Sequence, residues 1–216
     1  MPRHLQRQID KLKQAILALV EMVQQSVRDA IEAVESRDVA LAQRVIESDT
    51  AIDQMEIDVE EECLHTLALF QPVADDLRFV VAVLKINNDL ERIGDLATNI
   101  AKNSIALAAD PDISLKPFGI DEMAKLAGEM IKQSLDSLVE IDAAKARNVC
   151  KSDDAVDDLH ARMYDLVEKQ VSENAGRFPQ LLRLLITARH LERMADDAVN
   201  IAEDVIYLIE GEIVRH

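Results

Sequence analysis

Residues 90–101 read LERIGDLATNIA, and residues 191–202 repeat the pattern as LERMADDAVNIA. Side chains four positions apart share one face of an α-helix. Each copy therefore places a glutamate, an aspartate and an asparagine on one face of an otherwise apolar helix: Glu91, Asp95 and Asn99 in the first copy, and Glu192, Asp196 and Asn200 in the second. The repeat predicts a duplicated helical fold, and its aligned oxygen atoms suggest a pair of metal-binding surfaces.

The composition favours long helices over sheets. The chain has 216 residues, of which 49% are hydrophobic, yet only 3% are aromatic and there is no tryptophan. Five glycines and five prolines are far below the usual shares of about 7% and 5%. Apolar residues recur at helical spacing almost throughout, as in Ile16, Leu19, Val23 and Val27. The sequence therefore predicts an all-α protein with an aliphatic core.

Few segments interrupt the helical pattern. Ser36-Arg37-Asp38 is expected to end one helix and cap the next, since serine and aspartate favour N-caps. Gln71-Pro72 breaks a second helix, because the residue before proline avoids the α region. Ile141-Asp142 and residues 174–179 break the second half in the same way, and the prolines within residues 109–119 favour a linker. Six helices of roughly 20 to 35 residues follow.

The two halves are related beyond this pattern. The motif QQSV at 24–27 resembles KQSL at 132–135, and SDTAID at 48–53 resembles SDDAVD at 152–157. The offset between the copies shrinks along the chain, and each step falls in an expected turn, where insertions are tolerated best. We therefore predict two tandem antiparallel three-helix bundles, spanning residues 1–108 and 120–216 and joined by a linker at 109–119.

The charge balance excludes several classes of function. The net charge is −17, from 41 acidic and 24 basic residues, which disfavours binding to nucleic acid or to anionic lipid. No stretch of 18 apolar residues is present and the start of the chain is unlike a signal peptide, so no direct membrane insertion is expected. Cys63 and Cys150 lack a CxxC partner and are interpreted as core residues in a reducing compartment. These features predict a cytoplasmic protein.

Each half carries two pairs of acids spaced four apart, on its second and third expected helices. A hard cation prefers several oxygen ligands, and two such pairs supply four. About eight acidic pairs would arise by chance in so acidic a chain, so a single pair is no more than a solvated helix face. Four pairs at matching places favour metal ligands, although the acids could instead pair with Arg92, Arg193 and nearby bases. The candidate ligands are Asp49, Asp53, Glu91, Asp95, Asp153, Asp157, Glu192 and Asp196.

Four further residues are candidate ligands by position. Glu56 follows Asp53 by three residues, just as His160 follows Asp157. A single histidine is more often structural, but as a ligand His160 would make the second site suit iron or zinc better than magnesium. Asn99 and Asn200 are either ligands or polar contacts between helices. The stretch from Glu62 to His65 matches one Glu-x-x-His motif of di-iron bundles, but the second copy that such a site needs is missing, so His65 is assigned a structural role.

Residues 87–101 (NNDLERIGDLATNIA) and 191–204 (LERMADDAVNIAED) resemble the PhoU family, and the resemblance extends over nearly the whole chain. It implies a cytoplasmic regulator of phosphate uptake that acts with the ATPase subunit of the phosphate ABC transporter and with a sensor histidine kinase. Such proteins repress the phosphate-starvation response when phosphate is plentiful. The resemblance also implies a homodimer and metal ions bound by the eight acids, with iron, manganese, magnesium and zinc all candidates.

Three classes of function compete. The leading one is a metal-binding regulatory adaptor, with no catalytic residues. The others are a purely structural helical interaction module, whose acids only solubilise it, and a di-iron carboxylate enzyme. The sequence shows no glycine-rich phosphate loop and no arginine cluster, so we expect any contact with phosphate to run through bound metal.

Overall fold

The computed structural model describes residues 3–109 and 115–211, and these residues are almost entirely helical. Within them no helix is long and apolar enough to cross a membrane. The α-helices are α1 (Arg3–Ser36), α2 (Val39–Phe70), α3 (Ala74–Ala108), α4 (Ile120–Glu140), α5 (Ala143–Cys150), α6 (Asp153–Glu173) and α7 (Phe178–Glu210), with short 3-10 helices η1 (Lys116–Phe118) and η2 (Ala175–Arg177).

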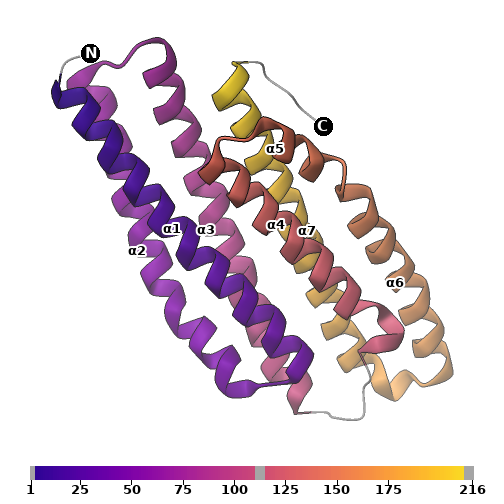
Figure 1. Ribbon diagram of the computed structural model, residues 1–216. Coiled ribbons are helices and arrows are strands. Elements are labelled where there is room, and N and C mark those ends of the chain that lie inside the picture. The colour runs from indigo at the N-terminus through magenta and orange to yellow at the C-terminus, as the bar shows by residue number, and fades with distance from the viewer. Residues whose placement is uncertain (1–2, 110–114, 212–216) are drawn as a thin grey trace.

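The helices form two bundles that lie side by side (Figure 1). Helices α1 to α3 form the first bundle, and α4 to α7 form the second. Helix α1 shows why the chain folds this way, because its apolar residues fall on one stripe and are fully buried there, as at Leu12, Leu19 and Val23. Cys63 and Cys150 are buried and unpaired in this aliphatic interior. The predicted all-α fold of two tandem three-helix bundles is confirmed.

The second bundle differs from the prediction in one element. A single helix was expected from Asp142 to about residue 173, but the described chain divides there into α5 and α6. Backbone bonds of the 3-10 type close the break, since Lys151 and Ser152 donate to the carbonyls of Asn148 and Val149. Asp153 and Asp154 then open α6, where acids favour the positive end of the helix dipole. Among the described residues, one of the six expected helical segments is therefore divided by a short break into α5 and α6.

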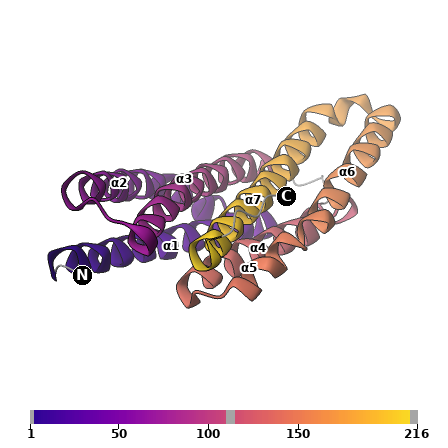
Figure 2. The ribbon, with the colours of Figure 1, turned by 90° about the horizontal axis from the view of Figure 1, so that it is seen from above.

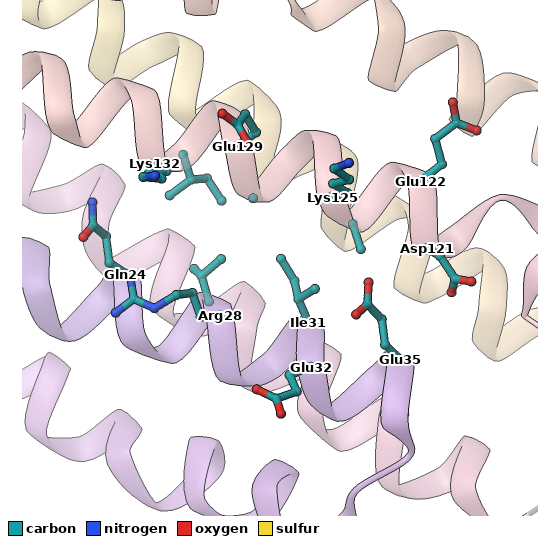
Figure 3. Close-up of a pocket in the computed structure, with 14 residues that line it drawn as sticks. Gln24, Arg28, Ile31, Glu32, Glu35, Asp121, Glu122, Lys125, Glu129 and Lys132 are labelled. Carbon is teal, nitrogen blue, oxygen red and sulfur yellow. The ribbon is translucent and has the colours of Figure 1, made fainter.

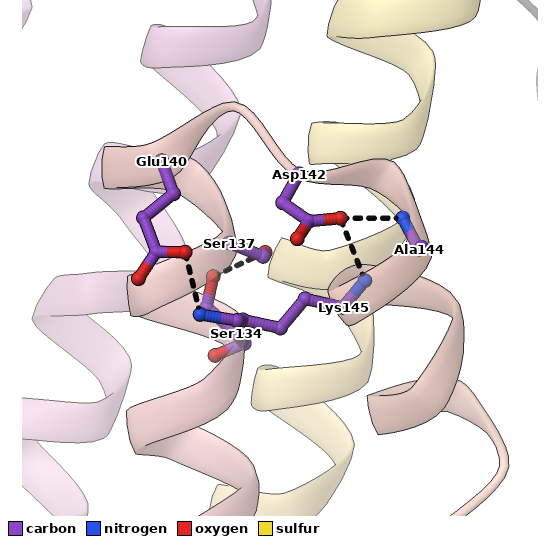
Figure 4. Close-up of polar contacts among 6 residues, drawn as sticks. All are labelled: Ser134, Ser137, Glu140, Asp142, Ala144 and Lys145. Atoms are coloured by element: carbon purple, nitrogen blue, oxygen red, sulfur yellow. Dashed lines mark hydrogen bonds and ion pairs between the residues drawn. The ribbon is translucent and has the colours of Figure 1, made fainter.

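The turns after α1 and α4 have the same construction. Arg37 and Ile141 both adopt left-handed backbone conformations, with φ of 56° and 55°. The next residue in each turn is an aspartate that caps the following helix: Asp38 accepts from the Leu41 amide at 3.0 Å, and Asp142 accepts from the Ala144 and Lys145 amides. Figure 4 shows the second turn, in which Glu140 also pairs with Lys145 at 2.7 Å. Both helix breaks occur where the sequence predicted them.

Helices α3 and α7 join the two bundles and run antiparallel, as the two ion pairs between them show. Lys85 Nζ lies 2.7 Å from Asp204 Oδ1, and Arg92 Nη2 lies 2.9 Å from Asp197 Oδ1. Moving along α3 therefore moves backward along α7. Figure 2 shows the same two helices adjacent when the molecule is viewed from above. The repeated motif therefore lies on the two helices that join the bundles.

A glycine sets the distance between α2 and α3 beside the first acid pair. A Cβ at Gly94 would lie 3.1 Å from Ile52 Cγ2, closer than ordinary packing allows. Ile52 lies between Asp49 and Asp53 in sequence and is 1% exposed. The glycine therefore lets the backbones of the two acid-bearing helices approach closely.

Candidate metal centres

The first acid set comes from α2 and α3, which present Asp49 and Asp53 toward Glu91 and Asp95. Burial raises the pKa of Asp49, and the charges of Asp53 and Asp95 raise it further. Burial also raises the pKa of Glu91, followed by the charges of Asp95, Glu56, Asp53 and Asp49. The negative charges of carboxylates on α2 and α3 therefore raise one another's pKa. The four predicted ligands of the first half, with Glu56 as a fifth acid, thus lie within electrostatic range of one another.

Two members of this first set, Asp49 and Glu56, differ in their hydrogen bonding. Asp49 Oδ1 is buried and has no hydrogen-bond partner, although the Thr98 hydroxyl lies near enough to lower the carboxyl pKa in part. Glu56 is held by Asn87, whose amide nitrogen donates to Glu56 Oε1 and to its carbonyl, both at 3.0 Å. A buried carboxylate oxygen without a donor is costly, and a cation would satisfy it.

The second acid set comes from α6 and α7. Burial raises the pKa of Glu192, as does the charge of Asp196, while His160 lowers it. Burial and then the charge of Asp157 raise the pKa of Asp196. These effects of charge on pKa place Asp157, Glu192, Asp196 and His160 within electrostatic range of one another. Asp153, the remaining predicted ligand, is half-buried at the first residue of α6, one turn before Asp157.

Arginine charges act on the second set, as the alternative pairing of the acids with Arg92, Arg193 and nearby bases allowed. Arg193, Arg92 and Arg189 all lower the pKa of Asp196. Arg189 and Arg193 lie one turn apart on α7, and Arg92 reaches across from α3. The packing of α3 on α7 therefore adds the charge of Arg92, which is distant in sequence, to those of Arg189 and Arg193 near Asp196.

His160 lies at the edge of the second set. It is 8% exposed, its Nδ1 is 3.9 Å from Glu192 Oε1, and its ring meets that of Tyr164 edge-on at 5.3 Å. Its Nε2 is buried without a hydrogen-bond partner. An imidazole nitrogen in this position has a lone pair or a proton that nothing in the described protein satisfies.

The donor atoms of both sets have the chemistry that a bound cation needs. Their side chains, however, do not converge on a common centre. Asp49 Oδ1 in the first set and His160 Nε2 in the second are buried atoms that lack partners. Over residues 3–109 and 115–211, however, no three His, Cys, Asp or Glu side chains stand in an arrangement that could hold a metal ion. Metal binding would therefore require side-chain rotation toward a common centre.

The two asparagines of the repeat do not behave alike. Asn200 lies close enough to Asp197 to lower its pKa, and it lines a polar pocket with Asp89 and Asp204 rather than joining the second acid set. Asn99 is half-buried on α3 and, within the described chain, makes no hydrogen bond to the acids. The contact of Asn200 with Asp197 is made within α7, and the pocket it lines also includes Asp89 of α3.

The junction between the bundles contains buried acids that the sequence analysis missed. Burial, with the charges of Asp197 and Asp204, raises the pKa of Asp89 to about 7. Burial also raises the pKa of Asp197 to about 6, even though Arg92 and Arg193 lower it. The sequence contained one indication of a buried acid here: Asp197 occupies a position of an apolar helix face at which the first repeat has Leu96. The polar pocket beside Asp89 has a volume of about 550 Å³.

A larger groove of about 950 Å³ lies between α1 and α4 (Figure 3). It is lined by the apolar Ile31 and by Gly128, together with charged side chains such as Arg28, Glu35 and Lys125. None of the predicted metal ligands lines it. The groove and the candidate metal centres are therefore separate features of the molecule.

The fold and the site define a class of protein in which two tandem three-helix bundles each carry opposed carboxylates on two neighbouring helices. A family model described as the PhoU domain matches residues 16–104 and again residues 120–205, so the chain belongs to the PhoU family. The chain is 39% identical to a phosphate-specific transport system accessory protein PhoU homolog of Aquifex aeolicus, over 97% of this chain and 95% of that protein.

Solved structures agree with this assignment. The crystal structure of PhoU from Pseudomonas aeruginosa is 33% identical and superimposes with a TM-score of 0.92, covering 96% of this chain and 99% of that one. The phosphate transport system regulatory protein PhoU from Streptococcus pneumoniae is 29% identical, with a TM-score of 0.85 over 98% and 100% of the two chains. The resemblance of the repeated motif to the PhoU family is confirmed.

Proposed function

We propose that this chain is a cytoplasmic regulator of phosphate uptake that binds metal ions through its two acid sets. In this proposal it is an adaptor, not an enzyme, and docks as a homodimer onto the ATPase subunit of a phosphate ABC transporter and onto a sensor histidine kinase. It represses the phosphate-starvation response when phosphate is plentiful. The observation that carries the proposal is the pair of opposed carboxylate sets, one in each repeat of a PhoU-family chain.

The chemistry of the two sets supports the metal-binding part of the proposal. Asp49, Asp53, Glu91 and Asp95 would hold a cation in the first bundle, and Asp153, Asp157, Glu192 and Asp196 would hold one in the second. Oxygen ligands suit iron, manganese and magnesium, and zinc also accepts carboxylates. The bound ion would neutralise carboxylates that now raise one another's pKa. It would also link α2 to α3 and α6 to α7, and so stiffen each bundle.

Binding to the transporter ATPase tests the adaptor role. The purified ATPase subunit is immobilised, and the metal-loaded protein is passed over it beside D95N/D196N, which removes one acid from each set. D58N/D158N removes the same charge from exposed positions on α2 and α6 and serves as the matched control. We expect the parent and the control to bind and D95N/D196N to bind at least about tenfold more weakly, a difference of about 1.4 kcal/mol. Equal binding by all three proteins would contradict a role for the acid sets in docking.

Contact with phosphate is proposed to run through the metal of the second set. The positive charges of Arg92, Arg189 and Arg193 lie near Asp196 and suit an anion held at an open metal position. Calorimetric titration of phosphate should therefore show binding to the metal-loaded protein and none to the stripped protein. Tight binding to the stripped protein would show that the metal is not needed.

A further inference from the structure

The groove between α1 and α4 has the size and the lining to receive a helix. Its lining on α4 extends from Asp121 to Lys132, which at 1.5 Å per residue is about 16 Å, or three helical turns. The buried apolar residues Val27, Ala124 and Ile131, each at most 3% exposed, form part of this lining. The groove therefore offers an apolar surface about three turns long beside a volume of about 950 Å³.

Helices α1 and α4 run antiparallel along the groove, because residues 24–35 and residues 121–132 are numbered in opposite directions across it (Figure 3). The two helices approach closely between its ends, where a Cβ at Gly128 would lie 2.9 Å from Ile31 Cδ1. A third helix laid along two neighbouring helices packs its rows of side chains against both. An amphipathic helix binds such a groove through an apolar stripe of residues three and four apart.

The charges of the lining are unevenly placed. Glu35, Asp121 and Glu122 lie at one end of the groove, whereas Arg28 and Lys132 lie toward the other (Figure 3). In the described chain none of these five side chains forms an ion pair with another across the groove. Over the whole lining five acids face three bases. The groove thus has an acidic end and a basic end, and it is acidic on balance.

This polarity determines which occupant fits and in which direction. A helix carries about half a positive elementary charge at its N-terminus and about half a negative one at its C-terminus. The N-terminus therefore fits the acidic end, and basic side chains in the first turn would strengthen the match. A second copy of this chain, with a net charge of −17, would instead bring mainly like charge to the groove.

From these observations we infer that the groove between α1 and α4 binds a basic amphipathic helix of a partner protein, with the N-terminus of that helix beside Glu35 and Asp121. The apolar stripe of the helix packs against α1 and α4, and acids in its last turn meet Arg28 and Lys132. This inference rests on the adaptor role proposed above and adds the docking surface and the kind of partner. It does not depend on metal, because no residue of either acid set lines the groove.

Two synthetic helical peptides of about 14 residues, or four turns, serve as probes. They have the same composition, the same apolar stripe and the same net positive charge. One has lysines in its first turn and glutamates in its last, and the other has the reverse order. A covalent staple on the solvent side keeps both helical, which circular dichroism checks. Because the two peptides carry equal charge, non-specific attraction to the acidic chain affects both equally. Fluorescence anisotropy measures their affinity for the full chain.

Two variants exchange the charges of the groove on one helix each, without a change in net charge. R28E/E35K acts on α1 and D121K/K132E acts on α4. Circular dichroism establishes that each is folded, and the two variants are independent in case one of them is not. R44E/E47K makes the same exchange at exposed positions of α2 outside the groove and is the matched control.

We expect the parent and R44E/E47K to bind the peptide with lysines in its first turn at least about tenfold more tightly than the reversed peptide. R28E/E35K and D121K/K132E should each reduce this preference to less than about threefold, and their combination should invert it. Equal binding of the two peptides by the parent, binding of neither, or an unchanged preference in the folded groove variants would overturn the inference.

Binding of the parent to the transporter ATPase, measured as described above, separates this inference from the proposed function. A parent that binds the ATPase but shows no preference between the peptides would overturn the inference alone. A parent that prefers the expected peptide but does not bind the ATPase would overturn the proposed function.

Discussion

Asp89 carries a carboxyl group whose pKa, about 7, lies well above the usual value for aspartate because the group is buried near Asp197 and Asp204. The folded protein therefore holds this proton more tightly than the unfolded chain does. As a result, the contribution of Asp89 to the free energy of unfolding falls as the pH rises from about 4 to about 7 and stays low above that. The junction between the bundles thus contains an acid that ionises near neutral pH, and its ionisation opposes folding.

We predict that D89N is more stable than the parent at about pH 8, and that the difference disappears below about pH 4, where the parent carboxyl is also uncharged. Thermal melting of both proteins across this range, with chelator present, measures the effect. A difference in melting temperature that is the same at both ends of the range would show that charge at Asp89 is not the cause.

Ile141 is a β-branched residue in a left-handed conformation, with φ of 55°, which costs about 1–2 kcal/mol. Its side chain is 56% exposed, so a substitution there loses little buried area. We predict that I141N raises the free energy of unfolding in urea by about 1 kcal/mol, because asparagine tolerates this conformation. R37N at the equivalent turn is the comparison and should gain less, since arginine is not β-branched. An unchanged or lower stability of I141N would refute the account of this turn.

At the scale of the element, the packing of α2 against α3 depends on the sizes of two residues that face each other. Gly94 lies opposite Ile52 in the first bundle, and the equivalent repeat positions hold Ala195 and Val156. The two pairs carry the same number of side-chain carbon atoms. One methyl group has therefore been exchanged between the two positions, which conserves the volume between the helices.

We predict that G94A destabilises the protein, because overpacking costs about 1–3 kcal/mol and exceeds the gain of about 1 kcal/mol from replacing glycine within a helix. G94A/I52V reproduces the pair of the second repeat and should recover most of the loss. A double-mutant cycle by urea denaturation measures the coupling, with I52V alone as the control. A stabilising G94A would mean that Ile52 moves aside freely and that Gly94 does not set the distance between the helices.

At the scale of the whole molecule, the two bundles are joined across α3 and α7 by a buried charge. Asp197 is fully buried and its ion-pair partner Arg92, which is 43% exposed, comes from the other bundle. Removing one partner of a buried pair leaves an uncompensated charge, whereas replacing both with apolar residues is often neutral or stabilising.

We predict that R92M lowers the free energy of unfolding by about 1–2 kcal/mol, less than the 3–5 kcal/mol typical of a fully buried pair, because Arg92 is partly solvated. R92M/D197L should regain or exceed the stability of the parent, since leucine is the residue that the first repeat has at this position. Urea denaturation of the three proteins distinguishes these outcomes. A double variant less stable than R92M would show that Asp197 stabilises the junction by another interaction.

The local features of the fold could be predicted from the sequence, whereas those made by packing could not. The Asp38 and Asp142 caps and the break at Gln71-Pro72 depend on neighbouring residues, so the sequence pattern located them. The pairing of Asp49 with Asp95 followed from the repeat and helical periodicity.

The arrangement of Arg92 beside Asp197 depends on how one bundle packs on the other, which no local pattern encodes. The break between α5 and α6 was missed for another reason. Ser152 corresponds to Ser48, which lies within the continuous α2, so the repeat itself suggested an unbroken helix.

Metal content is the most direct test of the central claim, which is that both acid sets bind metal ions. Elemental analysis is made on protein purified without chelator, for the parent, D95N/D196N and the charge-matched D58N/D158N. We predict bound metal in the parent and in D58N/D158N, and its loss from D95N/D196N. A parent without metal even after reconstitution with iron, manganese, magnesium and zinc, or a D95N/D196N variant that retains all of it, would contradict the account.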